Sequence, residues 1–383
     1  MEIPFHRSYT TDADIQGVVD TLKSGWLTMG PRTVQFENRF AELVSANHAV
    51  AVNSCTAALH LSLRVLGIGP GDEVIVPAMT FAASAEVVCY LGARPVITDV
   101  DPETHLITVD EIEKHLSPKT KAIIPVHFAG QAVDLDEIMD LAKKHQLKVV
   151  EDAAHCFPSF YKGRPIGGIG DVTAFSFYAT KTLAVGEGGM ATTNDEELAN
   201  QMKILRLHGI SRDAWKRYTR EGSWYYEVVD AGFKYNMTDI QASLGLTQLD
   251  VAEEAWKKRT KIAERYNTAF REHKALRIPV IKTDRQTSWH LYVLRINPEA
   301  LTISRDDFIN KLKEAGIGTS VHFIPLYRHP YYRQLTNADL KNFPNSEWLF
   351  ERIISLPIFP GMTEEQIDYV IDNVLRIADE FSR

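Results

Sequence analysis

The chain has 383 residues, of which 45% are hydrophobic and 24% are charged, as in ordinary soluble globular proteins. A single hydrophobic core stops growing at roughly 250–300 residues, so a chain of this length is expected to form two domains. The formal net charge of −8 disfavours nucleic acid or an anionic membrane as a partner, and no apolar run approaches the roughly 18 residues that a membrane-spanning helix needs.

Neither a secretion signal nor a disulfide framework is indicated. The first residues lack a basic region followed by an apolar one, so we expect a cytoplasmic protein. The three cysteines, Cys55, Cys89 and Cys156, have no close-pair spacing, which disfavours both disulfides and a zinc site.

Strands and helices alternate along the first half of the chain. The amphipathic pattern of residues 12–24 predicts a helix that ends at Gly25, and a loop follows at residues 26–31. Apolar runs predict strands at residues 48–53, 73–77, 95–100, 122–127, 149–150 and 172–177, and periodicity predicts helices at residues 80–90, 109–115, 135–145 and 195–208. This alternation is typical of a parallel sheet covered by helices, in the α/β class.

A helix is expected to open at residues 54–60, directly after a strand. Small residues there let the backbone approach a ligand, and the free amides of a helix start, aided by its dipole, bind phosphate. Thr56 adds a hydroxyl to such a site. A simple helix cap by Ser54 or Thr56 is the alternative that the residues leave open.

Two predicted strands deliver polar residues where they end, and this is the main clue to function. The first gives way to Asp152 and His155, and the second is closed by Ser176 and then Lys181. In a parallel sheet, the carboxyl ends of the strands face one crevice in which ligands bind. An acid and a lysine are therefore expected in the same crevice.

Three interpretations of Lys181 are open. It is a solvated surface lysine, a phosphate-gripping P-loop lysine, or a lysine that forms a Schiff base with a carbonyl. The glycine pattern of a P-loop is missing before Lys181, which removes the second. Enzymes that use pyridoxal phosphate need a Schiff-base lysine and an acid that holds the pyridine nitrogen protonated, and Asp152 supplies the acid.

Two further side chains have an ordinary alternative beside the functional one. Phe81 lies at a strand-to-helix switch, where an aromatic ring can stack on a ligand, although a lone phenylalanine is more often core. His155 with Cys156 and His127 suggests a metal site, but the spacing does not converge, so no metal is expected.

The second half of the chain is less regular. Residues 209–230 form a long connection rich in aromatic and charged groups, which we expect to cover the site and contact a sugar and a diphosphate. Helices are expected at residues 240–249 and 251–273, and a small α/β domain follows. Its predicted parts are strands at residues 289–296 and 318–322 and helices at residues 305–315 and 363–381.

The chain resembles the sugar aminotransferases of the DegT/DnrJ/EryC1/StrS family, which have the aspartate aminotransferase type fold, PLP-dependent fold type I. The ordered motifs that carry the resemblance cover nearly the whole chain. They are GWLT with GP (25–31), NSCTAAL (53–59), PAMTF (77–81), PVH (125–127), EDAAH (151–155), FSF (175–177) with Lys181, EGG (187–189) and KYNMTD (234–239).

The resemblance implies roles for the matching residues. Lys181 would bind the cofactor, pyridoxal 5′-phosphate, and move a proton, and Asp152 would pair with the pyridine nitrogen. The other implied cofactor contacts are Thr56, Ala57, Phe81, His155, Ser176 and Asn236, with Asn236 reaching across a dimer interface. The implied substrate contacts are Trp26, Thr28, Lys216, Arg220, Tyr226 and His322.

The family also implies a reaction and an assembly. An amino group would pass from L-glutamate, through the pyridoxamine form of the cofactor, to the C4 keto group of a UDP-linked deoxyhexose, for cell-surface polysaccharide or related amino-sugar synthesis. The alternatives are a 3-keto sugar or a cyclitol as acceptor, the dehydratase branch, against which Lys181 argues, and a non-catalytic regulator that binds the cofactor or a sugar nucleotide. We expect a homodimer with shared sites, a large cofactor-binding domain at residues 1–250, and a bridging helix with a small domain at residues 251–383.

Overall fold

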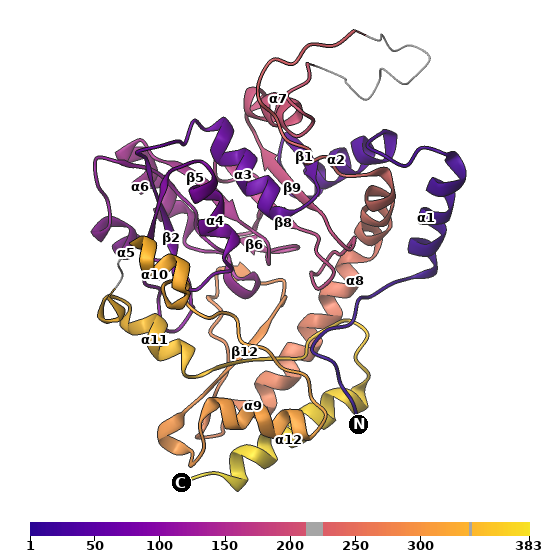
Figure 1. Ribbon diagram of the computed structural model, residues 1–383. Coiled ribbons are helices and arrows are strands. Elements are labelled where there is room, and N and C mark those ends of the chain that lie inside the picture. The colour runs from indigo at the N-terminus through magenta and orange to yellow at the C-terminus, as the bar shows by residue number, and fades with distance from the viewer. Residues whose placement is uncertain (212–224, 337–338) are drawn as a thin grey trace.

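The computed structural model describes residues 1–211, 225–336 and 339–383. Figure 1 shows a large sheet flanked by helices, a smaller unit with α9 and α12, and the long helix α8 running between them. No helix of the described part of the chain is both long and apolar enough to cross a membrane.

Within the described residues, seven strands form the main sheet in the order β1-β9-β8-β5-β4-β2-β3. Only β9 among them runs antiparallel to its neighbours, so the predicted parallel sheet is confirmed as mostly parallel. The strands are β1 (His48–Val52), β2 (Glu73–Pro77), β3 (Arg94–Thr98), β4 (Thr120–Ile123), β5 (Lys148–Asp152), β8 (Val172–Ser176) and β9 (Gly189–Thr193).

Helices cover both faces of this sheet, which explains the continuous apolar strands. Successive residues of a strand point to opposite faces, and here both faces are buried. Val149 and Phe175 pack in the core beneath α2 and α6, whereas Val150 and Ala174 pack in the core beneath α3 and α4. The flanking helices are α1 (Asp12–Ser24), α2 (Pro31–Leu43), α3 (Cys55–Val65), α4 (Ala83–Tyr90), α5 (Val109–Lys114), α6 (Leu135–His145) and α7 (Glu196–Leu205).

One helix, α8 (Asp239–Phe270), replaces the two that the sequence predicts on either side of residue 250. No glycine or proline interrupts the chain between Leu249 and Val251, so the helical hydrogen bonds continue. Thr238 begins the helix with a capping box that Gln241 completes. The division into domains at residue 250 therefore crosses a continuous helix, and it stays a prediction.

The smaller unit contains an antiparallel sheet of β10 (Leu276–Arg277), β12 (Tyr292–Ile296) and β13 (Ile353–Leu356). It packs with α9 (Arg305–Glu314) and α12 (Glu364–Glu380), both predicted. The predicted strand at residues 318–322 is wrong. Its residue Ser320 makes only an isolated bridge to Ser355, and the backbone just before it pairs with the N-terminal residue Ile3.

The remaining elements are short. They are β6 (Phe160–Tyr161), β7 (Arg164–Pro165) and β11 (Arg285–Gln286), which form a small sheet, with α10 (Pro330–Thr336) and α11 (Pro344–Phe350).

Candidate active site

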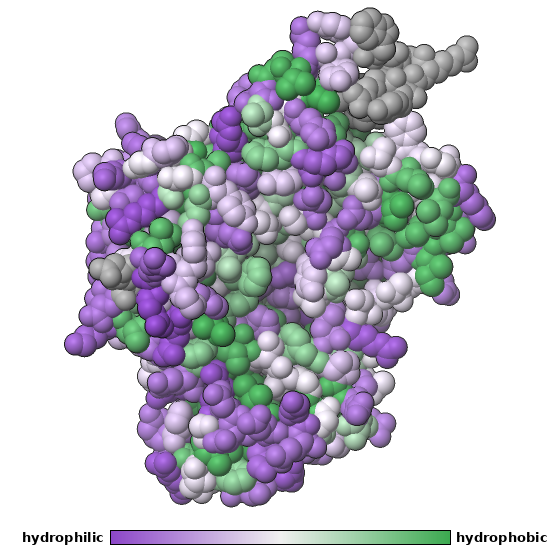
Figure 2. All heavy atoms as spheres, viewed as in Figure 1, coloured by the Kyte–Doolittle hydropathy of each residue, from purple (hydrophilic) through white to green (hydrophobic). Residues whose placement is uncertain are grey.

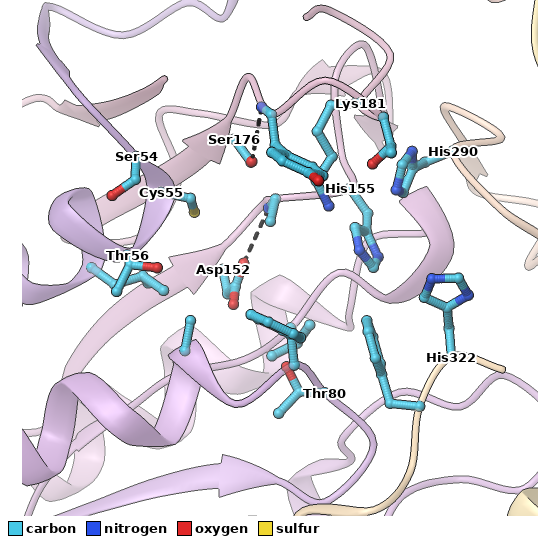
Figure 3. A pocket seen from close by; sticks show the side chains of 18 of the residues that line it. Ser54, Cys55, Thr56, Thr80, Asp152, His155, Ser176, Lys181, His290 and His322 are labelled. Atoms are coloured by element: carbon cyan, nitrogen blue, oxygen red, sulfur yellow. Dashed lines mark hydrogen bonds between the residues drawn. The ribbon is translucent and has the colours of Figure 1, made fainter. Parts of the chain in front are cut away.

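A cavity of about 480 Å³ opens at the carboxyl ends of β5 and β8, where the sequence places its crevice. Figure 3 shows the labelled side chains pointing into it from the strand ends, from the start of α3 and from the smaller unit. The predicted site residues that line it are Thr56, Phe81, Asp152, His155, Ser176, Lys181 and His322.

Lys181 lies in the turn that follows β8, which is closed by a hydrogen bond from the Lys181 amide to the Tyr178 carbonyl (2.9 Å). Desolvation in the cavity lowers the pKa of its amine to about 8, although the nearby Cys55 and Asp152 act in the opposite direction. A reactive fraction of the amine is therefore neutral near pH 7, as attack on a carbonyl requires.

Asp152 ends β5 with a buried carboxylate that two donors hold in place. Its Oδ2 accepts from the Ser84 hydroxyl (2.7 Å) and its Oδ1 from the Ala154 amide (3.1 Å). Because Ser84 donates to the carboxylate, Thr80 donates in turn to Ser84 Oγ (2.7 Å). The carboxylate is thus fixed at the floor of the cavity, and sequence analysis missed both hydroxyls that fix it.

His155 presents one ring nitrogen to the cavity in a defined tautomer. Its Nδ1 accepts from the Ala129 amide (3.2 Å), so Nε2 carries the proton of the neutral ring. Burial, followed by the charge of Lys181, holds the pKa of His155 well below its usual value. The ring packs on His290 and stacks on Phe323 with centroids 4.5 and 5.8 Å away. Nε2–H is a donor suited to a phenolic oxygen.

The start of α3 forms the end of the cavity that suits an anion. Ser54 Oγ caps the helix by accepting from the Ala57 amide (3.1 Å), which decides between the two alternatives for Ser54. Among the described residues, the amides of Cys55 and Thr56 have no acceptor and remain available to a phosphate. Ala57 does not line the cavity, so its predicted phosphate contact stays a prediction.

Glycine at position 189 makes this arrangement possible. A Cβ atom there would lie 2.4 Å from the Ser54 carbonyl oxygen, so β9 packs directly against the start of α3 only because the side chain is absent. Ser176, one strand away, adds a hydroxyl at the same end, and its Oγ accepts from the Tyr178 amide (3.3 Å).

Asn236 lies outside the cavity lining. It is buried beside β1, where its backbone bridges Val52, and its Nδ2 donates to the Met237 carbonyl (3.3 Å). Its Oδ1 is buried and has no hydrogen-bond partner among the described residues. Its predicted role across a dimer interface stays a prediction.

The predicted substrate residues are only partly brought together. Trp26 donates from its indole to the Met29 carbonyl (3.0 Å), and the Thr28 carbonyl accepts from the Asp239 amide (3.1 Å); neither residue lines the cavity. Tyr226 is exposed outside it. Lys216 and Arg220 lie outside the described residues.

Asp239 explains why the loop at residues 26–30 ends where it does. Its Oδ1 accepts from the amides of Gly30 (2.8 Å) and Thr33 (2.9 Å), so a residue at the start of α8 caps α2. The KYNMTD motif therefore has a structural role in addition to the one that the resemblance implies.

The smaller unit supplies the opposite wall of the cavity. His322 hydrogen-bonds through Nδ1 to Ser355 Oγ (2.8 Å), and burial lowers its pKa to about 4. Phe323 and His290 complete this wall, and sequence analysis assigned neither. His290 directly precedes the strand predicted best in this region, and a buried histidine beside a strand was the available signal.

No metal site accompanies the cavity in the described ranges, where no three His, Cys, Asp or Glu side chains are grouped to hold an ion. His127 instead donates from Nε2 to Glu151 Oε2 (2.9 Å) and accepts at Nδ1 from the Val133 amide (3.2 Å). This pair is buried beneath the crevice and supports β5.

Comparison with known proteins agrees with the geometry. The model of the DegT/DnrJ/EryC1/StrS aminotransferase family matches residues 9–375. The chain belongs to this family. Family membership confirms the resemblance seen in the sequence and the fold of PLP-dependent transferases of type I.

Full-length relatives share about half of the residues. The chain is 52% identical to the uncharacterized protein MJ1066 of Methanocaldococcus jannaschii, over 99% of this chain and 98% of the relative. It is 49% identical to the spore coat polysaccharide biosynthesis protein SpsC of Bacillus subtilis, over 98% and 97%.

A solved structure shows the same fold with the cofactor in two forms. The putative sugar aminotransferase Spr1654 of Streptococcus pneumoniae superposes with a TM-score of 0.93, covering 99% of this chain. Its PMP form is 39% identical over 100% of that chain, and its PLP form is 38% identical over 99%. With the family, these structures confirm pyridoxal 5′-phosphate and its pyridoxamine form as the cofactor.

The residues of the cavity fit this cofactor. The amine of Lys181 suits its aldehyde, the carboxylate of Asp152 suits its pyridine nitrogen, and the open amides at the start of α3 suit its phosphate. Phe81 is 63% exposed, so its ring is free to cover a bound aromatic group.

Proposed function

We propose that the protein moves the amino group of L-glutamate to the C4 keto group of a UDP-linked deoxyhexose, in the synthesis of cell-surface polysaccharide or a related amino sugar. The observation that carries the aminotransferase chemistry is the convergence of Lys181, its pKa lowered to about 8, with the doubly held Asp152 in one cavity. The names of SpsC and Spr1654 favour a polysaccharide pathway and a sugar substrate.

Each residue has a role that follows from its position. Bound pyridoxal phosphate supplies an electron sink for the negative charge that develops on the α-carbon of the donor. Asp152 favours the protonated pyridine nitrogen that this sink requires. His155 donates from Nε2 to the ring oxygen. Lys181 Nζ binds the cofactor and, once the donor has displaced it, carries the proton that leaves the α-carbon.

The sugar nucleotide enters from the side of the smaller unit in this proposal. His322 and Phe323 form the wall next to the cofactor end of the cavity, with one polar ring and one apolar ring for a sugar. Lys216 and Arg220 are proposed to meet the diphosphate, and Trp26, Thr28 and Tyr226 the rest of the nucleotide sugar. The net charge of −8 makes such local cations necessary for an anionic substrate.

We further propose a cytoplasmic homodimer in which Asn236 completes the partner's phosphate site. Figure 2 shows apolar residues gathered over α1, where Ile15, Leu22 and Leu27 are exposed. An exposed apolar patch of this kind favours an interface between proteins. The buried, unpartnered Oδ1 of Asn236 supports a contact that one described chain does not supply.

The test is the visible absorption of the protein before and after addition of excess L-glutamate. We expect a cofactor band that glutamate bleaches and that a UDP-linked 4-keto sugar restores, with release of an amino sugar. Keto sugars linked to dTDP or GDP, 3-keto sugars and cyclitol ketones serve as competing acceptors. A band that glutamate leaves unchanged would reject the donor, and restoration only by another acceptor would reject the C4 or UDP assignment.

A further inference from the structure

The N-terminal segment, residues 3–9, joins the smaller unit to the active-site cavity. Figure 1 shows the chain rising from the N-terminus beside the smaller unit to α1. The Ile3 amide donates to the Gly316 carbonyl and the Ile3 carbonyl accepts from the Gly318 amide, both at 2.8 Å. A Cβ atom at Gly318 would lie 2.6 Å from the Phe5 amide nitrogen. The segment is therefore in close backbone contact with the smaller unit.

Farther along, the same segment supplies two hydrogen bonds to the turn that carries the lysine. His6 Nε2–H donates to the Ala179 carbonyl at 3.0 Å, and Ser8 Oγ donates to the same oxygen at 3.1 Å. Ala179 lies inside the turn from Tyr178 to Lys181. Both lone pairs of this carbonyl thus have donors from a distant part of the chain, which fixes the plane of the Ala179 peptide.

The turn depends on such support because it belongs to no regular element. It lies between β8 and β9, where the chain leaves the ladder of the main sheet. Besides the bond that closes it, the amide of Tyr178 donates to Ser176 Oγ. The two bonds to Ala179 are its link to the N-terminal segment.

His6 is suited to a permanent donor role. Burial, and secondarily the charge of Arg259, lowers its pKa to about 4, so the ring is neutral at pH 7. A neutral imidazole carries one N–H, and the carbonyl acceptor places that proton on Nε2. The ring also packs edge-on against Phe359 of the smaller unit, with centroids 6.2 Å apart.

The residue before His6 reaches the opposite wall of the cavity. Phe5 stacks on the ring of His322, with centroids 5.6 Å apart and planes inclined by 25°. One short segment therefore contacts both the turn of Lys181 and the histidine of the substrate-side wall.

We propose that His6 and Ser8 are positioning residues for Lys181, and that the segment of residues 3–8 sets the place of the lysine relative to the wall that His322 forms. The Ala179 peptide, held by the two side chains, fixes the turn from which the lysine amine reaches the cofactor. This proposal rests on the proposed function for its kinetic consequence, whereas its spectroscopic consequence needs only cofactor binding.

The decisive experiment compares wild type with the double variant His6→Phe/Ser8→Ala, which keeps a packed ring and removes both donors. We expect the glutamate half-reaction to slow about tenfold, with the glutamate concentration for half-maximal rate unchanged, because misplaced reacting atoms lower the rate of the chemical step. We also expect a shifted pH midpoint of the cofactor band, which reports protonation of the Lys181 nitrogen, and slower capture of pyridoxal phosphate by the cofactor-free protein.

Two variants separate positioning from stability. His6→Gln keeps an N–H donor and should restore the rate and the pH midpoint, whereas Tyr9→Phe removes only the hydroxyl that meets Glu254 and should change neither. The exposed Ser8→Ala alone gives an intermediate effect if the double variant fails to fold. Wild-type values for rate, midpoint and capture in the variants without donors would overturn the proposal. If glutamate fails to react with wild type, the proposed function fails and the midpoint and capture rate still decide this one.

Discussion

The active-site cavity has two walls of different construction. One is made by the ends of β5 and β8 and the start of α3, so its side chains stand on regular elements packed in the core. The other, with His290, His322 and Phe323, comes from irregular segments of the smaller unit. Regular elements hold a lysine and a carboxylate in one fixed arrangement, whereas irregular segments tolerate changes of length and side chain. The first wall therefore suits the common chemistry and the second suits the choice of substrate.

Replacement of the lysine tests the chemical wall most severely. Lys181→Ala should abolish the cofactor band that glutamate bleaches and lower turnover by at least about ten-thousandfold, because no other amine occupies its place in the cavity. The absorption spectrum and single-turnover kinetics measure this. Lys148→Ala removes an exposed lysine at the opposite end of β5, bonded to Asp171, and should react as wild type.

Neutralising the acid should have the next largest effect. Asp152→Asn keeps the shape of the side chain and removes the charge that favours a protonated pyridine nitrogen, so we expect the half-reaction to slow about a hundred- to a thousandfold. Ser84→Ala keeps the carboxylate and removes one of its donors, which should give a smaller loss in the same rate. Equal rates in Asp152→Asn and wild type would disprove the assigned role.

A single methyl group should break the contact between β9 and α3. Gly189→Ala places Cβ 2.4 Å from the Ser54 carbonyl oxygen, and we expect a loss of about 2 kcal/mol in the free energy of unfolding together with weaker cofactor binding. Denaturant unfolding and cofactor titration measure the two effects. Gly69→Ala is the matched control, because nothing lies within 4 Å of a Cβ atom there.

The pKa of Lys181 predicts how cofactor capture depends on pH. With that pKa lowered to about 8 by desolvation, the amine is charged below pH 8 and neutral above it. The cofactor-free protein should therefore capture pyridoxal phosphate about tenfold faster at pH 9 than at pH 7, with a midpoint near 8. A midpoint above pH 10, the ordinary range of lysine, would contradict a desolvated amine.

Change in the second wall should be the mildest and should act on the acceptor alone. His322→Phe keeps the stacking on Phe5 and removes the ring nitrogens. We expect a rise of about fivefold in KM for the keto sugar, equivalent to one lost hydrogen bond, and no change in the glutamate half-reaction. A slowed half-reaction would show that the two walls are not separate in function.

The same contrast explains what could be predicted from the sequence. The residues of the chemical wall follow buried apolar runs directly, so their convergence follows from the rule that parallel strands end at one edge. Asp152, Ser176 and Lys181 were placed correctly at the cavity for this reason.

The missed features depend on contacts between residues far apart in the chain. The hydroxyls of Thr80 and Ser84 approach Asp152 only once α4 packs on the sheet, and no local pattern marks them. The strand predicted at residues 318–322 failed because the preceding backbone pairs with Ile3, more than 300 residues away in sequence. The cap of α2 by Asp239 is likewise invisible without the tertiary fold.

Helix α8 has a mechanical consequence. Its 32 residues form a rod of about 48 Å, whose first residue caps α2 and whose far end buries Tyr266 and Phe270 in the core of the smaller unit. Because an unbroken helix is stiff, a rotation of the smaller unit is levered along α8 to the loop at residues 26–30. Opening of the substrate side and displacement of the Trp26 loop are therefore one motion of the molecule.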